Sequence, residues 1–331
     1  MVQLKTEMDQ SAMFKEIIQD ELVQFDEYMA KALRNDKSHV SDIVEYTFKR
    51  DGKRIRPMLV FLVAKACGGV TAATFHGAVT VELLHSATLI HDDVIDESHT
   101  RRGRPSVNAI FDNKRSVLAG DYILSSSLVE STKTNNIEVI GLIAELGRNL
   151  AEGELSQYAL ANEIIIDEER YLDVIDKKTA SLLYACTKIG AITGGASRDV
   201  IESFGLVGKY MGMAFQIQDD IFDYYSNDVG KPTGNDIREG KITLPLIYAL
   251  RNSSEEKFKE MMSIIESQDY SPSNIDTLLS FAKDSGGIEY AEEKKSDYLK
   301  QSEDIIKKLS LNQDYKEALE LLLFYLKNRK Y

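Results

Sequence analysis

The sequence predicts an all-α protein in which residues 1–331 form a single domain of roughly ten or more helices. Apolar residues recur at intervals of three and four over long segments, which is the pattern of one buried helix face. Lys, Glu, Leu, Ile and Ala dominate these segments, and these residues favour helix. The sequence shows no alternating strand pattern, internal repeat or low-complexity linker, so we expect helices throughout.

Composition limits the function. With 53 acidic and 40 basic residues, the net charge is −13, which argues against a general nucleic-acid or anionic-membrane surface. Cys67 and Cys186 are far apart in the sequence, so we expect neither a disulfide framework nor a zinc site. We therefore expect the protein to work in a reducing compartment. Residues 1–10 lack an apolar signal core, and the apolar run from Met58 meets Lys65. We therefore expect a cytoplasmic protein without a transmembrane segment.

The first elements are two amphipathic segments, residues 11–34 and 41–48, which we expect to be packing helices. A basic turn at residues 51–57 follows and contains Lys53 and Arg56. Basic residues at the start of a helix can help its free N–H groups to hold a phosphate. A solvated basic loop is the alternative interpretation.

A long apolar helix is predicted over residues 74–96, and it ends in the acidic pattern Asp92-Asp93-Val94-Ile95-Asp96. Asp92 and Asp96 are four residues apart and therefore share one helix face. His85 lies two turns earlier on that face, where the alternative is an ordinary core histidine. His91 is expected to be structural.

Three arginines follow within ten residues of the aspartates, at positions 101, 102 and 104. They could pair with the aspartates at the surface, which would contribute little stability. The planar guanidinium also matches phosphate geometry. A segment carrying both charges is explained if the acids hold a metal and the arginines hold diphosphate oxygens.

Further helices are predicted over residues 116–131, 138–162 and 168–190. The last of these contains Lys178 and Thr179 in otherwise apolar surroundings, and the one before it offers Glu154 and Gln157. We expect these two helices to form another wall of a cavity.

The helix at residues 200–223 ends in a second copy of the acidic pattern, Asp219-Asp220-Ile221-Phe222-Asp223, preceded by Gln216. Residues 227–241 follow as a predicted flexible basic flap with Lys231 and Lys241. The phosphate-loop order is absent, and the segments after residue 245 are expected to be scaffold helices.

Each acidic pattern places carboxylates together without a basic residue between them, which costs stability unless a cation binds. Mg²⁺ binds one or two carboxylates and completes its shell with water and phosphate. A single copy could be a solvated helix face, but two copies flanked by basic residues favour a cage for a diphosphate.

These residues together resemble the trans-isoprenyl diphosphate synthases, or polyprenyl synthetases. The resemblance covers nearly the whole chain and rests on GKRIRP (52–57), LLHSATLIHDDVIDESHTRRGRP (83–105), LAGD (118–121), KT (178–179) and FQIQDDIFDYYSNDVGKPTGNDIREGK (215–241). It implies the isoprenoid synthase fold, a helical bundle around a central cavity, and a homodimer. One departure is Asp51, where the family commonly has a second glycine.

The resemblance implies a role for each matching residue. About three Mg²⁺ ions would be bound by Asp92, Asp96, Asp219 and Asp223. The catalytic set would be Asp92, Asp93, Asp96, Arg101, Lys178, Asp219, Asp220 and Lys231. The allylic diphosphate would be held by Arg101, Lys178, Thr179, Gln216, Lys231 and Lys241. Isopentenyl diphosphate would be held by Lys53, Arg56, His85 and Arg102.

The implied reaction joins isopentenyl diphosphate to an allylic diphosphate and releases diphosphate. In the family, bulky residues four or five positions before the first aspartate limit product length, and here Thr88 and Ala87 are small. We therefore expect a long all-trans product of C30 to C50. The alternatives are a short-chain farnesyl or geranylgeranyl diphosphate synthase, a terpene cyclase and a non-catalytic synthase subunit.

Overall fold

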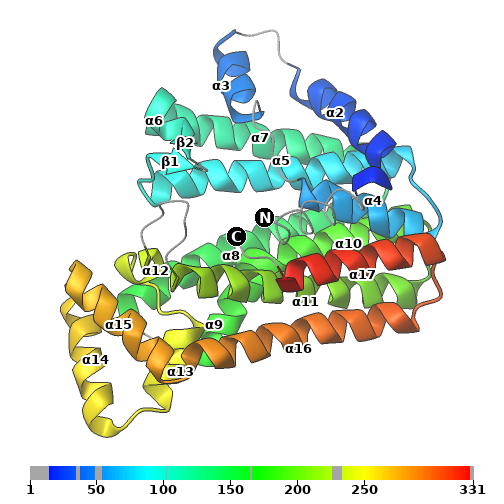
Figure 1. Ribbon diagram of the computed structural model, residues 1–331. Coiled ribbons are helices and arrows are strands. Elements are labelled where there is room, and N and C mark those ends of the chain that lie inside the picture. The colour runs from blue at the N-terminus through cyan, green and yellow to red at the C-terminus, as the bar shows by residue number, and fades with distance from the viewer. Residues whose placement is uncertain are drawn as a thin grey trace, which may run out of the picture. The chain divides into compact units, whose positions relative to one another are not determined.

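The computed structural model describes residues 15–34, 38–48, 54–101, 103–164, 166–225 and 233–328 (Figure 1). Within these residues the only strands are β1 (Thr100–Arg101) and β2 (Arg104–Pro105), which pair antiparallel. All other regular elements in this part of the chain are helices, so the predicted all-α class is confirmed.

The described residues fall into two compact units. The first draws on the ranges 1–147, 182–205 and 309–322, and the second on 148–181, 206–308 and 323–331. The expectation of a single domain stays a prediction.

The first unit is built around two long helices that lie side by side, α5 and α7 (Figure 1). Its elements are α2 (Gln19–Leu33), α3 (Ser38–Phe48), α4 (Ile55–Cys67), α5 (Ala72–Ile95), β1, β2, α6 (Val107–Phe111), α7 (Asn113–Lys133), α10 (Ser181–Thr193) and parts of α8 (Ile137–Glu163), α11 (Arg198–Asp223) and α17 (Gln313–Asn328). Thr71 begins α5, because its hydroxyl caps the Thr74 N–H while the Thr74 hydroxyl accepts from the Thr71 N–H.

The core of the first unit centres on α4, whose apolar residues surround the helix on all sides. Residues 57–64 of this helix are all buried. A helix that is apolar all round must be covered by its neighbours. α10 approaches it closely at Gly190, where a Cβ atom would lie only 2.6 Å from the Val60 carbonyl oxygen.

The second unit carries the end of α11. Its other elements are α9 (Glu168–Ile175), the π-helix η1 (Asp176–Ala180), α12 (Asn235–Arg238), α13 (Leu244–Arg251), α14 (Glu255–Ser267), α15 (Pro272–Asp284), α16 (Gly287–Lys308) and parts of α8 and α17. Apolar residues of α11, α13 and α15 form one core cluster, which includes Ile217, Leu246 and Leu278. The predicted scaffold after residue 245 is therefore helical and holds the end of α11 in place.

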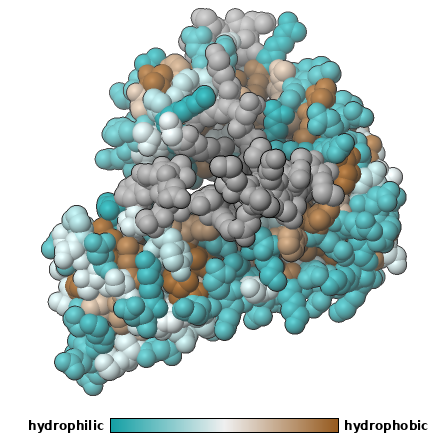
Figure 2. Space-filling view, viewed as in Figure 1, coloured by the Kyte–Doolittle hydropathy of each residue, from teal (hydrophilic) through white to brown (hydrophobic). Residues whose placement is uncertain are grey.

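Figure 2 shows a mostly hydrophilic surface with scattered apolar areas on the face in view. Within the described residues, no helix has the length and apolarity needed to cross a membrane. The expected cytoplasmic location stays a prediction.

Candidate active site

The first acidic pattern lies at the carboxyl end of α5. The helix ends at Ile95, and the Asp96 N–H donates to the Asp92 carbonyl oxygen at 2.8 Å, so these two residues are one turn apart as predicted. Asp92 is half-buried and Asp96 is exposed. A positive φ of 48° at Glu97 then turns the chain away from the helix axis.

Asp93 points into the protein instead, with an exposed fraction of 3%. The Arg101 guanidinium donates to its Oδ1 from Nε at 2.8 Å and from Nη2 at 2.6 Å. The Asp93 backbone carbonyl accepts from the Ser98 N–H at 2.9 Å and from Asn108 Nδ2 at 3.1 Å. Asp93 therefore ties the following hairpin to the end of α5, and Asn108 is a positioning residue that the sequence did not single out.

The hairpin of β1 and β2 carries Arg101 and Arg104. Gly103 allows its tight turn with a φ of 73°. The Ser106 hydroxyl donates to the Ser98 carbonyl at 2.7 Å, and the Tyr46 hydroxyl of α3 donates to the Pro105 carbonyl at 2.7 Å. Arg102 lies outside the described residues.

The residues before Asp92 on α5 lie where the helix packs into the first unit. Ala87 has an exposed fraction of 1%, and Thr88 is half-buried with its hydroxyl bonded to the His85 carbonyl at 2.9 Å. His85 is half-buried as well. Of the two small residues proposed to set product length, Ala87 is therefore the more deeply enclosed.

The predicted isopentenyl diphosphate residues are only partly described, because Lys53 lies outside the described residues. Arg56 is half-buried in the first turn of α4. Burial raises the pKa of the Cys186 thiol on α10 to about 12. The Arg56 charge lowers this pKa and the charge of Glu82 on α5 raises it, so the Arg56 guanidinium lies close enough to act on α10.

The second acidic pattern ends α11 and again has a buried second aspartate. Asp220 has an exposed fraction of 5%; its Oδ2 accepts from the Tyr171 hydroxyl at 2.6 Å and its Oδ1 from Gln216 Nε2 at 2.8 Å. Burial raises the pKa of the Asp220 carboxyl well above its ordinary value, and the nearby Asp236 charge raises it further. Asp219 is half-buried.

Asp223, the last aspartate of this pattern, holds the start of α12. Its Oδ1 accepts from the Asn235 N–H and its Oδ2 from the Asp236 N–H, both at 3.0 Å. Burial, followed by the Asp223 charge, raises the pKa of Asp236 to about 7. Each Asp223 oxygen still has a lone pair for a cation, because an ionised carboxylate has about four acceptor positions. Its metal role stays a prediction.

The segment predicted as a flap is partly helical, because α12 occupies Asn235–Arg238. Gly234 begins this short helix with a φ of 72°. Lys241 Nζ lies 2.5 Å from Glu239 Oε2. Lys231 lies outside the described residues. The expectation of one flexible loop was therefore wrong for residues 235–238, where Asp223 supplies the oxygens that cap the helix.

Lys178 and Thr179 lie on η1, a π-helical turn between α9 and α10. Lys178 Nζ lies 2.6 Å from Glu154 Oε2 and donates to Gln157 Oε1 at 3.1 Å, both on α8. The Thr179 hydroxyl donates to Gln216 Oε1 at 2.7 Å. The polar residues of these two helices therefore contact one another, while their expected role as a cavity wall stays a prediction. The sequence predicted an ordinary helix over residues 168–190, whereas the structure inserts a wide turn there.

The aspartates of the two acidic patterns offer carboxylate oxygens, and a hard cation such as Mg²⁺ prefers oxygen ligands. Asp92, Asp96 and Asp219 are at least partly accessible at helix ends. In the described part of the chain, no group of three or more His, Cys, Asp or Glu side chains is arranged to hold a metal ion.

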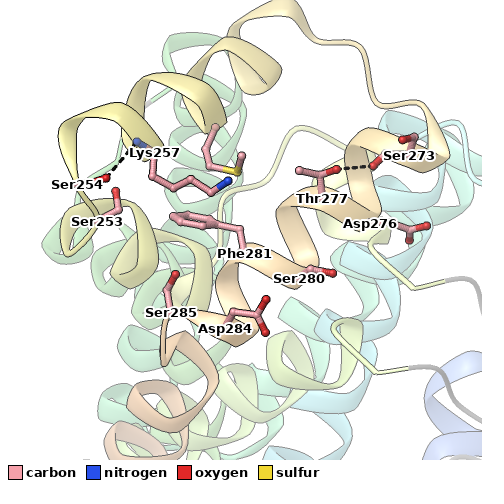
Figure 3. A pocket seen from close by; sticks show the side chains of 11 residues that line it. Ser253, Ser254, Lys257, Ser273, Asp276, Thr277, Ser280, Phe281, Asp284 and Ser285 are labelled. Carbon is pink, nitrogen blue, oxygen red and sulfur yellow. Dashed lines mark hydrogen bonds between the residues drawn. The ribbon is translucent and has the colours of Figure 1, made fainter.

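A cavity of about 680 Å³ lies elsewhere, among α14, α15 and the turn before α14 (Figure 3). Figure 3 shows Lys257 above the ring of Phe281, with Asp284 and Ser280 on the α15 side. None of its lining residues belongs to the predicted site.

Comparison with known proteins identifies the family. The family model described as polyprenyl synthetase matches residues 37–281. The chain belongs to the polyprenyl synthetase family. The matched region contains every site residue predicted from the sequence, from Lys53 to Lys241.

Relatives of this polyprenyl synthetase include enzymes named for long and for short products. The octaprenyl diphosphate synthase of Haemophilus influenzae is 34% identical over 90% of this chain and 91% of its own length. The crystal structure of geranylgeranyl pyrophosphate synthase from Bacteroides thetaiotaomicron is 40% identical with a TM-score of 0.84, covering 97% of this chain and 100% of that one. Prenyltransferase activity is thus a shared property, whereas product length differs between these relatives.

A third relative is the polyprenyl synthase of Caulobacter crescentus, solved in complex with calcium and isoprenyl diphosphate. It is 27% identical with a TM-score of 0.89, covering 97% of this chain and 98% of that one. The likeness confirms the predicted isoprenoid synthase fold. As a polyprenyl synthetase, the protein is a prenyltransferase of isoprenoid biosynthesis.

Proposed function

We propose that this polyprenyl synthetase extends an allylic diphosphate with isopentenyl diphosphate in an Mg²⁺-dependent reaction and makes a long all-trans product of C30 to C50. The observation that carries the proposal is the shared construction of the two acidic patterns. In each, the second aspartate is buried and hydrogen-bonded, while the first lies half-buried at the end of a long helix. The buried aspartate orients the helix end, and we assign the carboxylate of its neighbour to a cation.

The proposed metal ligands are Asp92, Asp96 and Asp219, with Asp223 as a further ligand. The relative from Caulobacter crescentus supports divalent metal use, because it was solved with calcium and isoprenyl diphosphate. Bound Mg²⁺ supplies positive charge that makes diphosphate a better leaving group.

The basic residues act on the same diphosphate. Arg101, Lys178 and Thr179 donate hydrogen bonds to its oxygens as the allylic C–O bond breaks, and preorganised donors stabilise charge that grows in the transition state. Arg56 and His85 hold isopentenyl diphosphate so that its double bond attacks the allylic carbon. A proton then leaves the new chain, and the released diphosphate accepts it, so no side-chain base is needed.

The test incubates the purified protein with Mg²⁺, isopentenyl diphosphate and dimethylallyl, geranyl or farnesyl diphosphate. Chromatography of the dephosphorylated products then gives their lengths. We expect all-trans products of C30 to C50. Products that stop at C15 or C20 would instead identify a short-chain synthase, cyclic hydrocarbons a terpene cyclase, and no turnover with any starter a non-catalytic subunit.

Substitution of Ala87 or Thr88 by Phe should shorten the product. Ala87 is enclosed, so a ring there has to project into the space available to the growing chain or strain its neighbours. Leu89→Phe is the matched control, because it adds a ring to the same helix at another angle. Product sizing with farnesyl diphosphate checks this. An unchanged length distribution in both variants would contradict a chain-length role.

We also propose that the protein is a homodimer. α7 exposes an unusual number of apolar side chains, with exposed fractions of 66% at Leu118, 56% at Val129 and 47% at Leu128. Such a face favours burial against a partner. Light scattering should give twice the mass of the chain, and the mass of one chain would contradict the dimer.

A further inference from the structure

The π-helical turn η1 lies at two of the predicted diphosphate-binding residues. It covers Asp176–Ala180 and therefore contains both Lys178 and Thr179. π-turns are rare because their wide backbone packs less well than an α-helix, and they are frequently found at functional sites. The turn must therefore be stabilised by its surroundings.

Two glycines let neighbouring helices press directly on the backbone of this turn. A Cβ atom on Gly153 of α8 would lie 2.9 Å from the Lys178 backbone nitrogen and 3.2 Å from the Lys178 Cα. A Cβ atom on Gly212 of α11 would lie 2.4 Å from the Ala180 Cα. Backbone atoms cannot rotate away, so any side chain at either position has to displace the turn or the helix.

Glycine inside a helix is itself unfavourable relative to alanine. Both glycines are buried inside long helices, and both contact the same five-residue turn. Elsewhere on α8, a Cβ atom at Gly147 would meet nothing within 4 Å. Gly153 and Gly212 thus differ from Gly147, because each of them allows the backbone of η1 to approach its helix.

A chain of side-chain hydrogen bonds fixes the turn on its polar side. The Thr179 hydroxyl donates to Gln216 at 2.7 Å, and Gln216 donates to Asp220 at 2.8 Å. The buried Tyr171 hydroxyl donates to the other Asp220 oxygen at 2.6 Å. All four side chains lie in the second unit, so the turn, α9 and the acidic end of α11 are held together.

We propose that Gly153, Gly212 and Tyr171 are positioning residues for prenyl transfer. The glycines set how deeply η1 sits against α8 and α11, and Tyr171 fixes the hydrogen-bond chain that ends at Thr179. Together they place the Lys178 ammonium and the Thr179 hydroxyl at the allylic diphosphate. This inference rests on the diphosphate-binding role proposed above for Lys178 and Thr179.

Kinetics of Gly153→Ala, Gly212→Ala and Tyr171→Phe test the inference, with Gly147→Ala as the matched control. A displacement of about 1 Å at a reacting centre can reduce the rate by about 100-fold. We therefore expect kcat/KM for the allylic diphosphate to fall by about 10- to 100-fold in both glycine variants and by a smaller factor in Tyr171→Phe. KM for isopentenyl diphosphate should stay unchanged, and Gly147→Ala should behave as wild type.

The same substitutions in a Lys178→Ala/Thr179→Val background separate positioning from general damage. If the glycines act through those two side chains, Gly212→Ala should cause a much smaller further loss there, because the effects of coupled residues are not additive. An equal loss in both backgrounds would overturn the inference. So would variants that match Gly147→Ala, or that raise KM for both substrates alike.

The Lys178→Ala/Thr179→Val variant also distinguishes a failure of the diphosphate-binding role from a failure of the positioning role. Wild-type kinetics in Lys178→Ala/Thr179→Val would refute the diphosphate role of these residues and with it this inference. Impaired kinetics there, combined with active Gly153→Ala and Gly212→Ala, would refute the positioning role alone. If Gly212→Ala shows no cooperative thermal unfolding, Gly153→Ala and Tyr171→Phe decide by the same criteria.

Discussion

Asp92→Asn and Asp219→Asn should each reduce turnover by orders of magnitude, about 10²- to 10⁴-fold, because each removes a negative charge that holds the proposed Mg²⁺ ions against the leaving diphosphate. The amide has nearly the same shape as the carboxylate, so packing should change little. The end of α5 is held by Asp93 through Arg101 and Asn108, and the end of α11 by Asp220 through Tyr171. Thermal unfolding should therefore stay close to wild type.

The matched control for this experiment is Asp297→Asn, which removes an exposed carboxylate from α16. Steady-state rates at saturating Mg²⁺ and substrates, together with circular dichroism melts, provide the measurement. Retained activity in either motif variant would mean that the metal site is misplaced. A large loss of thermal stability would instead indicate a structural role for the first aspartates.

Arg101→Ala should damage both stability and catalysis. The Arg101 side chain has an exposed fraction of 30% and the Asp93 side chain one of only 5%, so the substitution leaves a buried carboxylate without its cation. Breaking a buried pair typically costs 3–5 kcal/mol; we expect about 2–3 kcal/mol here, because Arg101 is partly exposed. Loss of a proposed diphosphate donor should also reduce kcat/KM for the allylic substrate by about 100-fold.

Arg104→Ala is a close control, because Arg104 is exposed and lies opposite Arg101 in the hairpin. Arg101→Lys should be intermediate, since lysine keeps the charge and loses the guanidinium fork. Urea unfolding and steady-state kinetics measure the two effects separately. If Arg101→Ala and Arg104→Ala unfold at the same urea concentration, the ion pair does not hold the hairpin to α5.

Helical periodicity predicted the fold class and the helix face of Asp92 and Asp96, because both follow from local geometry. The contacts of Lys178 with Glu154 and Gln157 were not predicted from the sequence, which indicated only that the two helices carry polar groups. The family resemblance was confirmed over residues 37–281. The individual site roles that it implies stay predictions.

Other features could not be predicted because they depend on contacts between residues far apart in the sequence. Tyr171 and Asp220 are 49 residues apart, and nothing near Tyr171 indicates a buried partner. The π-turn appears in the sequence as a continuous helix, and its close contacts with Gly153 and Gly212 come from other helices. Asp223 was predicted as a metal ligand alone, whereas it also caps α12 inside the expected loop.

Binding of an allylic diphosphate to the wild-type protein, with and without Mg²⁺, tests the central claim most directly. Calorimetric titration with a slowly reacting thiolo analogue of farnesyl diphosphate, in the absence of isopentenyl diphosphate, measures that binding without turnover. We predict that removing Mg²⁺ weakens the wild-type affinity by at least about 100-fold, and that Asp92→Asn and Asp219→Asn each lose most of this dependence. Equal affinity with and without Mg²⁺, or wild-type Mg²⁺ dependence in both variants, would contradict the claim that the two acidic patterns hold the diphosphate through metal ions.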